Sequence, residues 1–160
     1  MAAKGNISLQ KGIPKIEDAF IVIVKTEWNA QIVNKLEAAC TKVLSDHQIK
    51  YNTIIVPGAV EIPFAIKRYD NSNEQTADAF IALGTIVRGD TPHFDYVCKF
   101  ITDGILSLNL TLNVPVIFGV LTVENEQQAL NRAGGKHRNK GEEFAITAIK
   151  MIAINNSLKK

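Results

Sequence analysis

The stretch GTIVRGDTPHFDYVC, from Gly84 to Cys98, carries the side chains best suited to chemistry. Thr91 followed by Pro92 predicts a helix start with threonine as N-cap. The threonine hydroxyl can accept a hydrogen bond from a free backbone amide, and proline has no amide N–H to leave unpaired. His93 then falls in the first turn, where the positive end of the helix dipole disfavours imidazolium. A neutral imidazole there can transfer protons, although an ordinary surface histidine beside a cap has the same pattern.

The amides of such a helix start also form an anion site, to which the Thr91 hydroxyl can add. Asp90 would oppose a bound anion, so a positive counter-charge is required. The segment RAGGKHRNKG supplies four basic residues in a glycine-broken loop: Arg132, Lys136, Arg138 and Lys140. Arginine suits bidentate phosphate binding, but basic residues that complement the dipole at a helix end would have the same spacing.

Two further segments follow short apolar runs and hold groups that can bind a ligand. PGAVEIP, residues 57–63, predicts a tight turn and a helix start, where glycine lets the backbone approach a ligand. Glu61 in this turn can complement the helix dipole or accept hydrogen bonds from polyol hydroxyls. Trp28 and Asn29 place a flat apolar face beside an amide, although a lone tryptophan is more often part of a core or an interface.

Apolar runs and helical patterns alternate along the chain. The runs that predict buried strands span residues 20–24, 53–56, 80–83 and 116–121. Apolar residues at helical spacing follow at 33–47 and 97–112, and a helix over 141–157 closes the chain. These β-α units predict an α/β fold with a parallel sheet and helices on both faces. Ligands bind beyond the carboxyl ends of such strands, which places the expected site at residues 26–29, 57–61, 84–93 and 122–125.

Composition narrows the function classes. The chain has 160 residues, 46% hydrophobic and 21% charged, which predicts one soluble domain. Its 18 basic and 16 acidic residues leave too balanced a charge for a nucleic-acid or membrane surface. No membrane span or signal-peptide core is apparent, so we expect a cytoplasmic protein. Cys40 and Cys98 lie in apolar stretches, which favours buried free thiols in a reducing compartment.

Common site motifs are missing. No Gly-x-Gly-x-x-Gly follows the first strand, and Gly134-Gly135-Lys136 lacks the spacing of a P-loop. There is no Gly-x-Ser-x-Gly elbow, and the histidines lack partners at metal-ligand spacing. These absences disfavour dinucleotide-binding, hydrolase and metal-site interpretations.

Four separated motifs, VPGAVEIPFA, ALGTIVRGDTPHFDYVC, VPVIFGVLT and NRAGGKHRNKG, closely resemble those of lumazine synthases in order and spacing. The resemblance runs from about Lys15 to Ser157. It implies a flavodoxin-like three-layer α/β/α sandwich with a four-stranded parallel sheet, as one domain over residues 15–160. It also implies a homopentamer with active sites between neighbouring subunits, and in many members an icosahedral shell of about 60 subunits. Residues 1–14 would be an arm that adds a strand to a neighbour's sheet.

The resemblance implies a transferase of riboflavin biosynthesis. It would condense 5-amino-6-(D-ribitylamino)uracil with 3,4-dihydroxy-2-butanone 4-phosphate, giving 6,7-dimethyl-8-ribityllumazine, phosphate and water. No metal or organic cofactor, nucleic acid or membrane is implied, and riboflavin synthase is a candidate partner. Two alternatives stay open: a binding or shell-forming protein that holds a flavin-like ligand, and the related archaeal-type riboflavin synthase, which takes two lumazines.

Motif by motif, the resemblance assigns roles to residues of this chain. His93 matches the proton-transfer residue, Trp28 the aromatic that stacks on the pyrimidine ring, and Asn29 the amide beside it. The wall around the ring edge and the ribityl chain would be Ala59, Val60 and Glu61, and the pyrimidine pocket would be lined by Thr85, Ile86 and Val87. Asp90 and Thr91 match the segment that meets the sugar phosphate. A neighbouring subunit would supply Phe118 and the phosphate-binding Arg132, and Lys140 matches a nearby family lysine.

Three positions depart from the commonest family pattern. Val60 stands where many members have an aromatic residue, and Pro92 where threonine or alanine is frequent. Arg138 stands where shell-forming members often have glycine, so the chain loses a residue that tolerates positive φ. None of these changes removes a reactive group, but the last one bears on assembly.

Overall fold

The computed structural model describes residues 9, 11–72 and 74–159. Its centre is a parallel sheet of order β2-β1-β3-β4, which confirms the predicted α/β class. The strands are β1 (Phe20–Thr26), β2 (Lys50–Val56), β3 (Ala79–Val87) and β4 (Val116–Val123). All four runs extend beyond their predicted bounds. The prediction that Gly84 follows its strand was therefore wrong: the β-branched and apolar run continues through Val87, and β3 carries these residues to the edge of the sheet.

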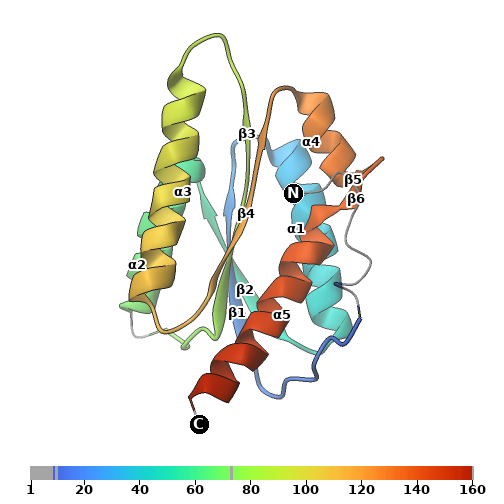
Figure 1. The fold of residues 1–160 in the computed structure, drawn as a ribbon, viewed down its shortest axis with the longest axis vertical. Coiled ribbons are helices and arrows are strands. Elements are labelled where there is room, and N and C mark those ends of the chain that lie inside the picture. Colours follow the sequence, from blue (N-terminus) through green and yellow to red (C-terminus); the bar gives the residue numbers. More distant parts are fainter. Residues whose placement is uncertain (1–8, 10, 73, 160) are drawn as a thin grey trace.

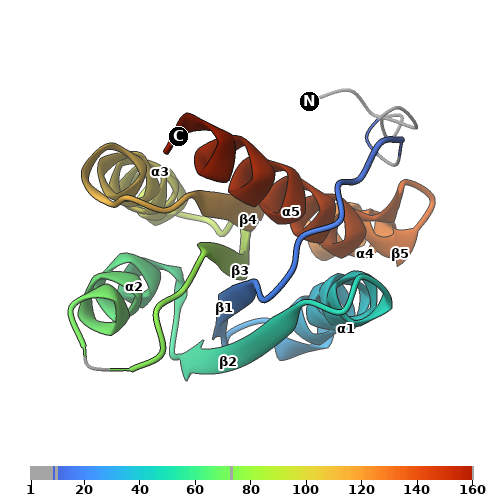
Figure 2. The same ribbon diagram turned by 90° about the horizontal axis from the view of Figure 1, so that it is seen from below.

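Helices cover both faces of the sheet, as predicted (Figures 1 and 2). One face carries α2 (Ile62–Asp70) and α3 (His93–Thr111), and the other carries α1 (Ala30–Asp46) and α5 (Lys140–Leu158). The remaining elements are the 3-10 turn η2 (Ala59–Glu61), the short helix α4 (Glu126–Arg132), and the hairpin of β5 (Ala133–Gly135) and β6 (Arg138–Asn139). The result is a three-layer sandwich.

Alternate residues along each strand point to opposite faces of the sheet, so their side chains contribute to two apolar cores, one on each face. Ile21 and Ile23 pack with Leu36 of α1 and Ile149 of α5, whereas Val22 and its neighbours pack with α2 and α3. The predicted apolar face of the last helix is buried, with members Phe144, Ala145, Ala148, Ile149 and Ile152. Gly141 permits the close contact of α5 with α1, because a Cβ there would overlap the Leu36 carbonyl.

The segment from residue 132 to 141 is more ordered than the predicted loop. Arg132 ends α4, and the next seven residues form the β5-β6 hairpin. Helix α4 is too short for a helical apolar period, and its start is fixed by the Asn125 side chain, which accepts a hydrogen bond from Gln128 N at 3.0 Å. Arg138 has φ 65°, so the position does demand the left-handed conformation expected from the family comparison.

The remaining predictions on the scaffold concern the two cysteines, membrane-spanning helices and the N-terminal arm. Cys40 is a buried free thiol, as predicted, and burial raises its pKa to about 12. Cys98 is also free but only half-buried. No helix among the described residues is long and apolar enough to cross a membrane. Residues 1–8 and 10 of the predicted arm lie outside the described residues, so its strand addition stays a prediction.

Candidate active site

A cavity of about 510 Å³ opens at the carboxyl ends of the strands, where the chain order switches between β1 and β3. We call it the β1/β3 cavity. Ten of the fourteen predicted site residues line it: Trp28, Asn29, Ala59, Val60, Glu61, Thr85, Ile86, Val87, Thr91 and His93. They come from four separate segments of the chain, which the sheet and α3 bring to one place. Their individual roles stay predictions.

The loop after β1 holds an aromatic side chain at the edge of the cavity. Trp28 is 75% exposed, and its backbone is fixed because its amide donates to Pro57 O at 3.1 Å and its carbonyl accepts from Thr26 Oγ1 at 3.0 Å. Asn29 has φ 58°, and its Nδ2 donates to Thr85 O at 2.7 Å across the switch point. A rigid backbone thus presents an indole that the protein itself leaves uncovered.

The turn after β2 forms the second wall. Gly58 N donates to Glu61 Oε2 at 2.9 Å, and a Cβ at Gly58 would lie only 3.0 Å from the same oxygen. Glycine therefore lets the turn close onto the carboxylate. This contact fixes one oxygen of Glu61, and the other has no hydrogen-bond partner among the described residues. Glu61 can therefore accept a hydrogen bond from a ligand.

The end of β3 forms the floor of the cavity with Thr85, Ile86 and Val87. The Thr85 hydroxyl is buried and makes no hydrogen bond within the described part of the chain. Its carbonyl is occupied by Asn29. An unpaired buried hydroxyl is uncommon in folded proteins, because burial removes its water without replacing it.

Helix α3 begins at His93, one residue later than predicted. Pro92 is the N-cap residue, so the prediction of Thr91 as N-cap and Pro92 at the first helical position was wrong by one residue. The proline ring holds φ at −62°, and the chain already turns there. The Thr91 hydroxyl accepts from His93 N at 3.4 Å, which is a long hydrogen bond. His93 is exposed at the rim of the cavity.

Four predicted residues lie outside the cavity within one copy of the chain: Asp90, Phe118, Arg132 and Lys140. Asp90 is in the exposed loop before α3, and Phe118 lies on the edge strand β4 with 36% exposure. Arg132 Nη1 donates to Gln128 O at 2.9 Å, so within one copy it complements the end of α4. Lys140 is buried, and its Nζ pairs with Glu143 at 2.7 Å.

Six lining residues were not among the fourteen predicted site residues: Thr26, Pro57, Gly58, Gly89, Phe94 and Val97. The first four fall within the segments expected beyond the strand ends, so position alone could have included them. Val97 had been assigned only to the apolar face of its helix, and Phe94 had no separate signal. Within the described ranges, no three side chains of His, Cys, Asp or Glu gather as metal ligands would.

Just beyond the cavity, Arg88 links three elements. Its Nε donates to Glu124 Oε2 at 2.8 Å, its Nη2 donates to Asp95 Oδ1 at 3.0 Å, and its Cζ lies 4.1 Å from the centre of the Phe94 ring. Its own amide donates to Val123 O at 2.9 Å. The hydrogen bond with Asp95 is the main cause that raises the pKa of Arg88.

Known proteins resemble this chain over nearly its whole length. Residues 18–156 match the family model described as 6,7-dimethyl-8-ribityllumazine synthase. The relative of that name from Parabacteroides distasonis is 47% identical over 143 residues, 88% of each chain. The relative from Cytophaga hutchinsonii is 43% identical over 156 residues, 95% of this chain and 97% of its own, and that from Porphyromonas gingivalis is 46% identical over 147 residues, 90% of each.

The match extends across all four strands and every segment that lines the β1/β3 cavity. Both the family model and the relatives exceed what chance similarity gives over such a length. The chain therefore belongs to the 6,7-dimethyl-8-ribityllumazine synthase family.

Proposed function

We propose that the β1/β3 cavity is the site where the chain condenses 5-amino-6-(D-ribitylamino)uracil with 3,4-dihydroxy-2-butanone 4-phosphate. Family membership assigns the chain lumazine synthase activity in riboflavin biosynthesis. The observation that carries the location is the convergence of ten predicted site residues on one cavity. A cavity of about 510 Å³ is within the range that binds small molecules.

The pyrimidine ring binds between the Trp28 indole and the floor formed by β3. An exposed tryptophan on a fixed backbone loses little conformational freedom when a ring stacks on it. The backbone of residues 85–87 and the Asn29 side chain supply polar groups at the ring edge.

The ribityl chain lies along the turn after β2. Glu61 keeps one carboxylate oxygen on Gly58 N and offers the other to the hydroxyls of the polyol. A carboxylate forms stronger hydrogen bonds with hydroxyls than a neutral acceptor does.

The sugar phosphate binds near the start of α3. Thr91 and the positive end of the α3 dipole approach the phosphate, while Asp90 opposes it. Arg132 of an adjacent copy supplies the counter-charge, because Arg132 of the same copy does not line the cavity. His93, at the rim, transfers protons during imine formation, loss of phosphate, enolisation and ring closure.

Positioning contributes more to this reaction than proton transfer does. Joining two substrates in one cavity gives effective molarities of roughly 10⁵ to 10⁸ M, whereas one acid-base group gives roughly 10² to 10⁴. His93 therefore accelerates the reaction without being indispensable.

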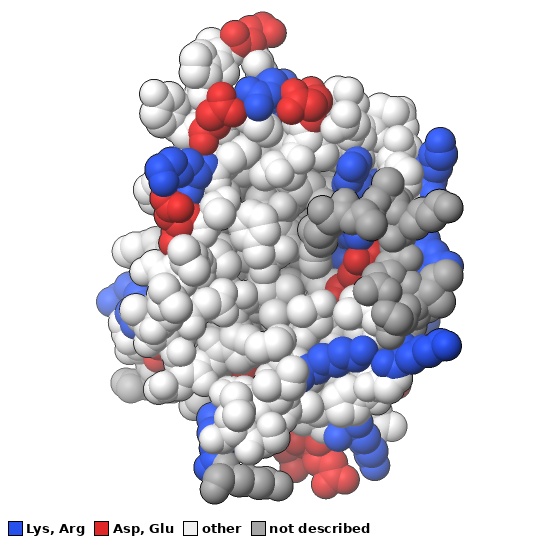
Figure 3. Space-filling view, in the orientation of Figure 1, with Lys and Arg blue, Asp and Glu red and all other residues white. Residues whose placement is uncertain are grey.

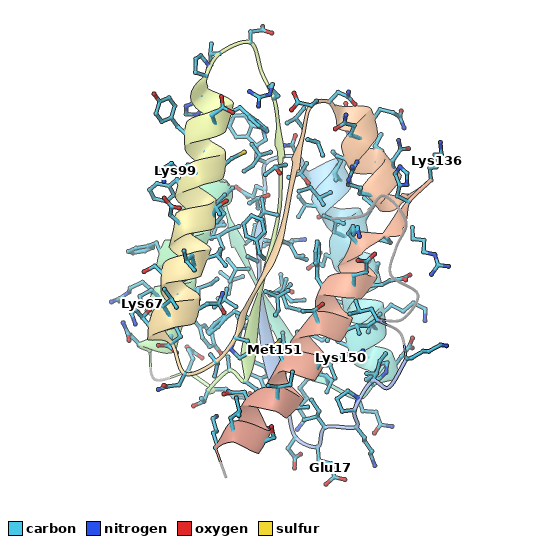
Figure 4. The ribbon with its side chains drawn as sticks, viewed as in Figure 1. Glu17, Lys67, Lys99, Lys136, Lys150 and Met151 are labelled. Carbon is cyan, nitrogen blue, oxygen red and sulfur yellow. The ribbon has the colours of Figure 1, made fainter. Side chains whose placement is uncertain are left out.

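Several exposed apolar side chains support assembly of the chain into a pentamer. Those on α3 share one helical face: Tyr96, Phe100, Leu106 and Leu110. Phe118 and Met151 are exposed on β4 and α5. Figure 3 shows that the middle of the face over β4, between α3 and α5, is free of charged side chains, and Figure 4 shows Met151 on this face. Extensive apolar surface of this kind is typical of protein interfaces.

The proposal also covers the bounds of the catalytic domain, the N-terminal segment and the cellular location. We propose that residues 15–160 form the catalytic domain, and that residues 1–14 extend to a neighbouring copy. Lys150 Nζ donates to the carbonyls of Leu9 and Lys11, at 2.7 and 3.0 Å, and so ties these two residues of the segment to α5. The free thiols of Cys40 and Cys98 favour a cytoplasmic location. A 60-subunit shell and association with riboflavin synthase stay predictions.

One assay tests the activity and separates the alternatives. Purified protein is mixed with both substrates, and the fluorescent lumazine product is followed against the spontaneous reaction. We expect product well above the spontaneous rate, and Arg132→Ala should chiefly raise the KM for the sugar phosphate. No product above background would favour a binding protein, and consumption of lumazine to give riboflavin would favour riboflavin synthase. A shift of the uracil KM alone would mean that Arg132 has another role.

A further inference from the structure

We propose that Arg88 is a positioning residue of the reaction, which holds the helical turn carrying His93 against the ends of β3 and β4. This inference rests on the proposed function, because it concerns the geometry of the same site. We call Arg88 with Asp95, Glu124 and Phe94 the Arg88 clamp.

The turn that carries His93 packs on the core through Phe94, and Asp95 N donates to Pro92 O at 3.0 Å, but the segment just before the turn has little support. Residues 88–92 are all exposed, so the connection from β3 to α3 crosses solvent. The N-cap residue Pro92 offers no side-chain cap, and the hydrogen bond from His93 N to Thr91 Oγ1 is long at 3.4 Å. Loops and helix ends of this kind open easily. A catalytic group placed there needs an external restraint.

The Arg88 clamp supplies that restraint from three directions. The guanidinium donates to both oxygens of Asp95, at 3.0 and 3.4 Å, within the first turn of α3. It stacks at 4.1 Å on Phe94, the residue directly after His93, and Phe94 lines the cavity. Its third contact, from Nε to Glu124 at 2.8 Å, reaches the end of β4. A planar group with donors on several edges can make all these contacts at once, and a lysine cannot.

Arg88 does not serve as a phosphate ligand. It is absent from the residues that line the cavity, and its charge is already balanced by two carboxylates. All members of the Arg88 clamp that carry charge are partly exposed, and exposed ion pairs add little to global stability. Its effect therefore falls on the geometry of the turn rather than on folding.

The test compares steady-state kinetics of Arg88→Met, Arg88→Lys and Asp95→Asn with those of the intact protein. Both Arg88 variants should lower kcat by about tenfold, because a small misplacement of a catalytic group costs on the order of 10 to 10² in rate. The uracil KM should stay within about twofold, since the ring binds to Trp28 and β3. The double variant Arg88→Met/Asp95→Asn should be no slower than Arg88→Met alone, because both changes break the same contact.

Lys42→Met is the matched control. It breaks an exposed ion pair with Asp46 on α1, away from the cavity, and should leave kcat unchanged. Full kcat in Arg88→Lys would overturn the proposal, because charge alone would then suffice. Additive losses in the double variant, or a uracil KM that rises with the fall in kcat, would overturn it as well. If Arg88→Met does not fold, the kinetics of Arg88→Lys and Asp95→Asn still test whether Arg88 positions the turn. An intact protein without activity would instead reject the proposed function.

Discussion

Replacing Arg138 with glycine should stabilise the protein. Arg138 lies in the β5-β6 hairpin with φ 65°, and a left-handed conformation costs a residue with a Cβ roughly 1 to 2 kcal/mol. Glycine removes this strain but adds freedom to the unfolded chain, which costs roughly 0.4 to 1 kcal/mol. The difference predicts a gain of about 0.5 to 1 kcal/mol in the free energy of unfolding. The exposed Arg138 side chain should contribute little that opposes this gain.

The assay is urea unfolding followed by circular dichroism, at one fixed protomer concentration because assembly shifts apparent stability. Fluorescence of the single tryptophan is a poor reporter, since Trp28 is exposed in the folded protein. Lys136→Gly is the control, because Lys136 is in the same turn without positive φ and projects away from the body of the protein (Figure 4). It should lose roughly 0.5 to 1 kcal/mol. A loss of stability in both variants would refute backbone strain at Arg138.

Three further predictions concern the site and the core. His93→Ala should lower kcat by about 10²-fold in folded protein, and complete inactivity would contradict the dominant role of positioning. Burial raises the pKa of Cys40 from 9.0 to about 12, because it disfavours the thiolate in the folded protein. The buried neutral thiol contributes its full stability below about pH 9. Above that pH the thiol ionises in the unfolded chain, so this contribution to the unfolding free energy is lost as pH rises toward 12. Between about pH 8 and 10.5 the unfolding free energy should fall by about 2 kcal/mol more than in Cys40→Ala, and equal slopes in urea titrations would refute this. Thr85→Val removes an unpaired buried hydroxyl and should raise the unfolding free energy by about 1 kcal/mol, whereas a loss in urea unfolding would show that the hydroxyl is engaged.

The sequence was informative wherever a local pattern had one structural solution. Buried parallel strands need continuous apolar runs, so the sheet was predictable from Phe20–Val24 and the three runs after it. The rule that ligands bind beyond strand ends then identified residues 26–29, 57–61 and 84–93, which meet at the β1/β3 cavity, whereas the fourth expected segment, 122–125, contributes no lining residue. The family motifs assigned individual residues within those segments, and ten of them line the cavity.

Other features depend on contacts between distant residues, which no local pattern encodes. The three contacts of Arg88, just after β3, reach α3 and the residue after β4, and Glu124 is 36 residues away in sequence. Helix α4 was missed because its seven residues are too few to show a helical apolar period. Its start is fixed instead by the Asn125 side chain. The single-residue error at the start of α3 arose because Pro92 adopts a helical φ before the first helical residue.

The most direct test of the central claim is complementation between two defective copies. His93→Ala removes a group at the cavity of one copy, and Arg132→Ala removes the charge that we assign to its neighbour. If the two variants are co-expressed in equal amounts, random assembly around a ring makes about one quarter of the sites intact. Lumazine formation should then reach about a quarter of the normal rate, well above either variant alone at low sugar phosphate. A mixture no more active than the mean of the two variants would contradict a site shared between copies.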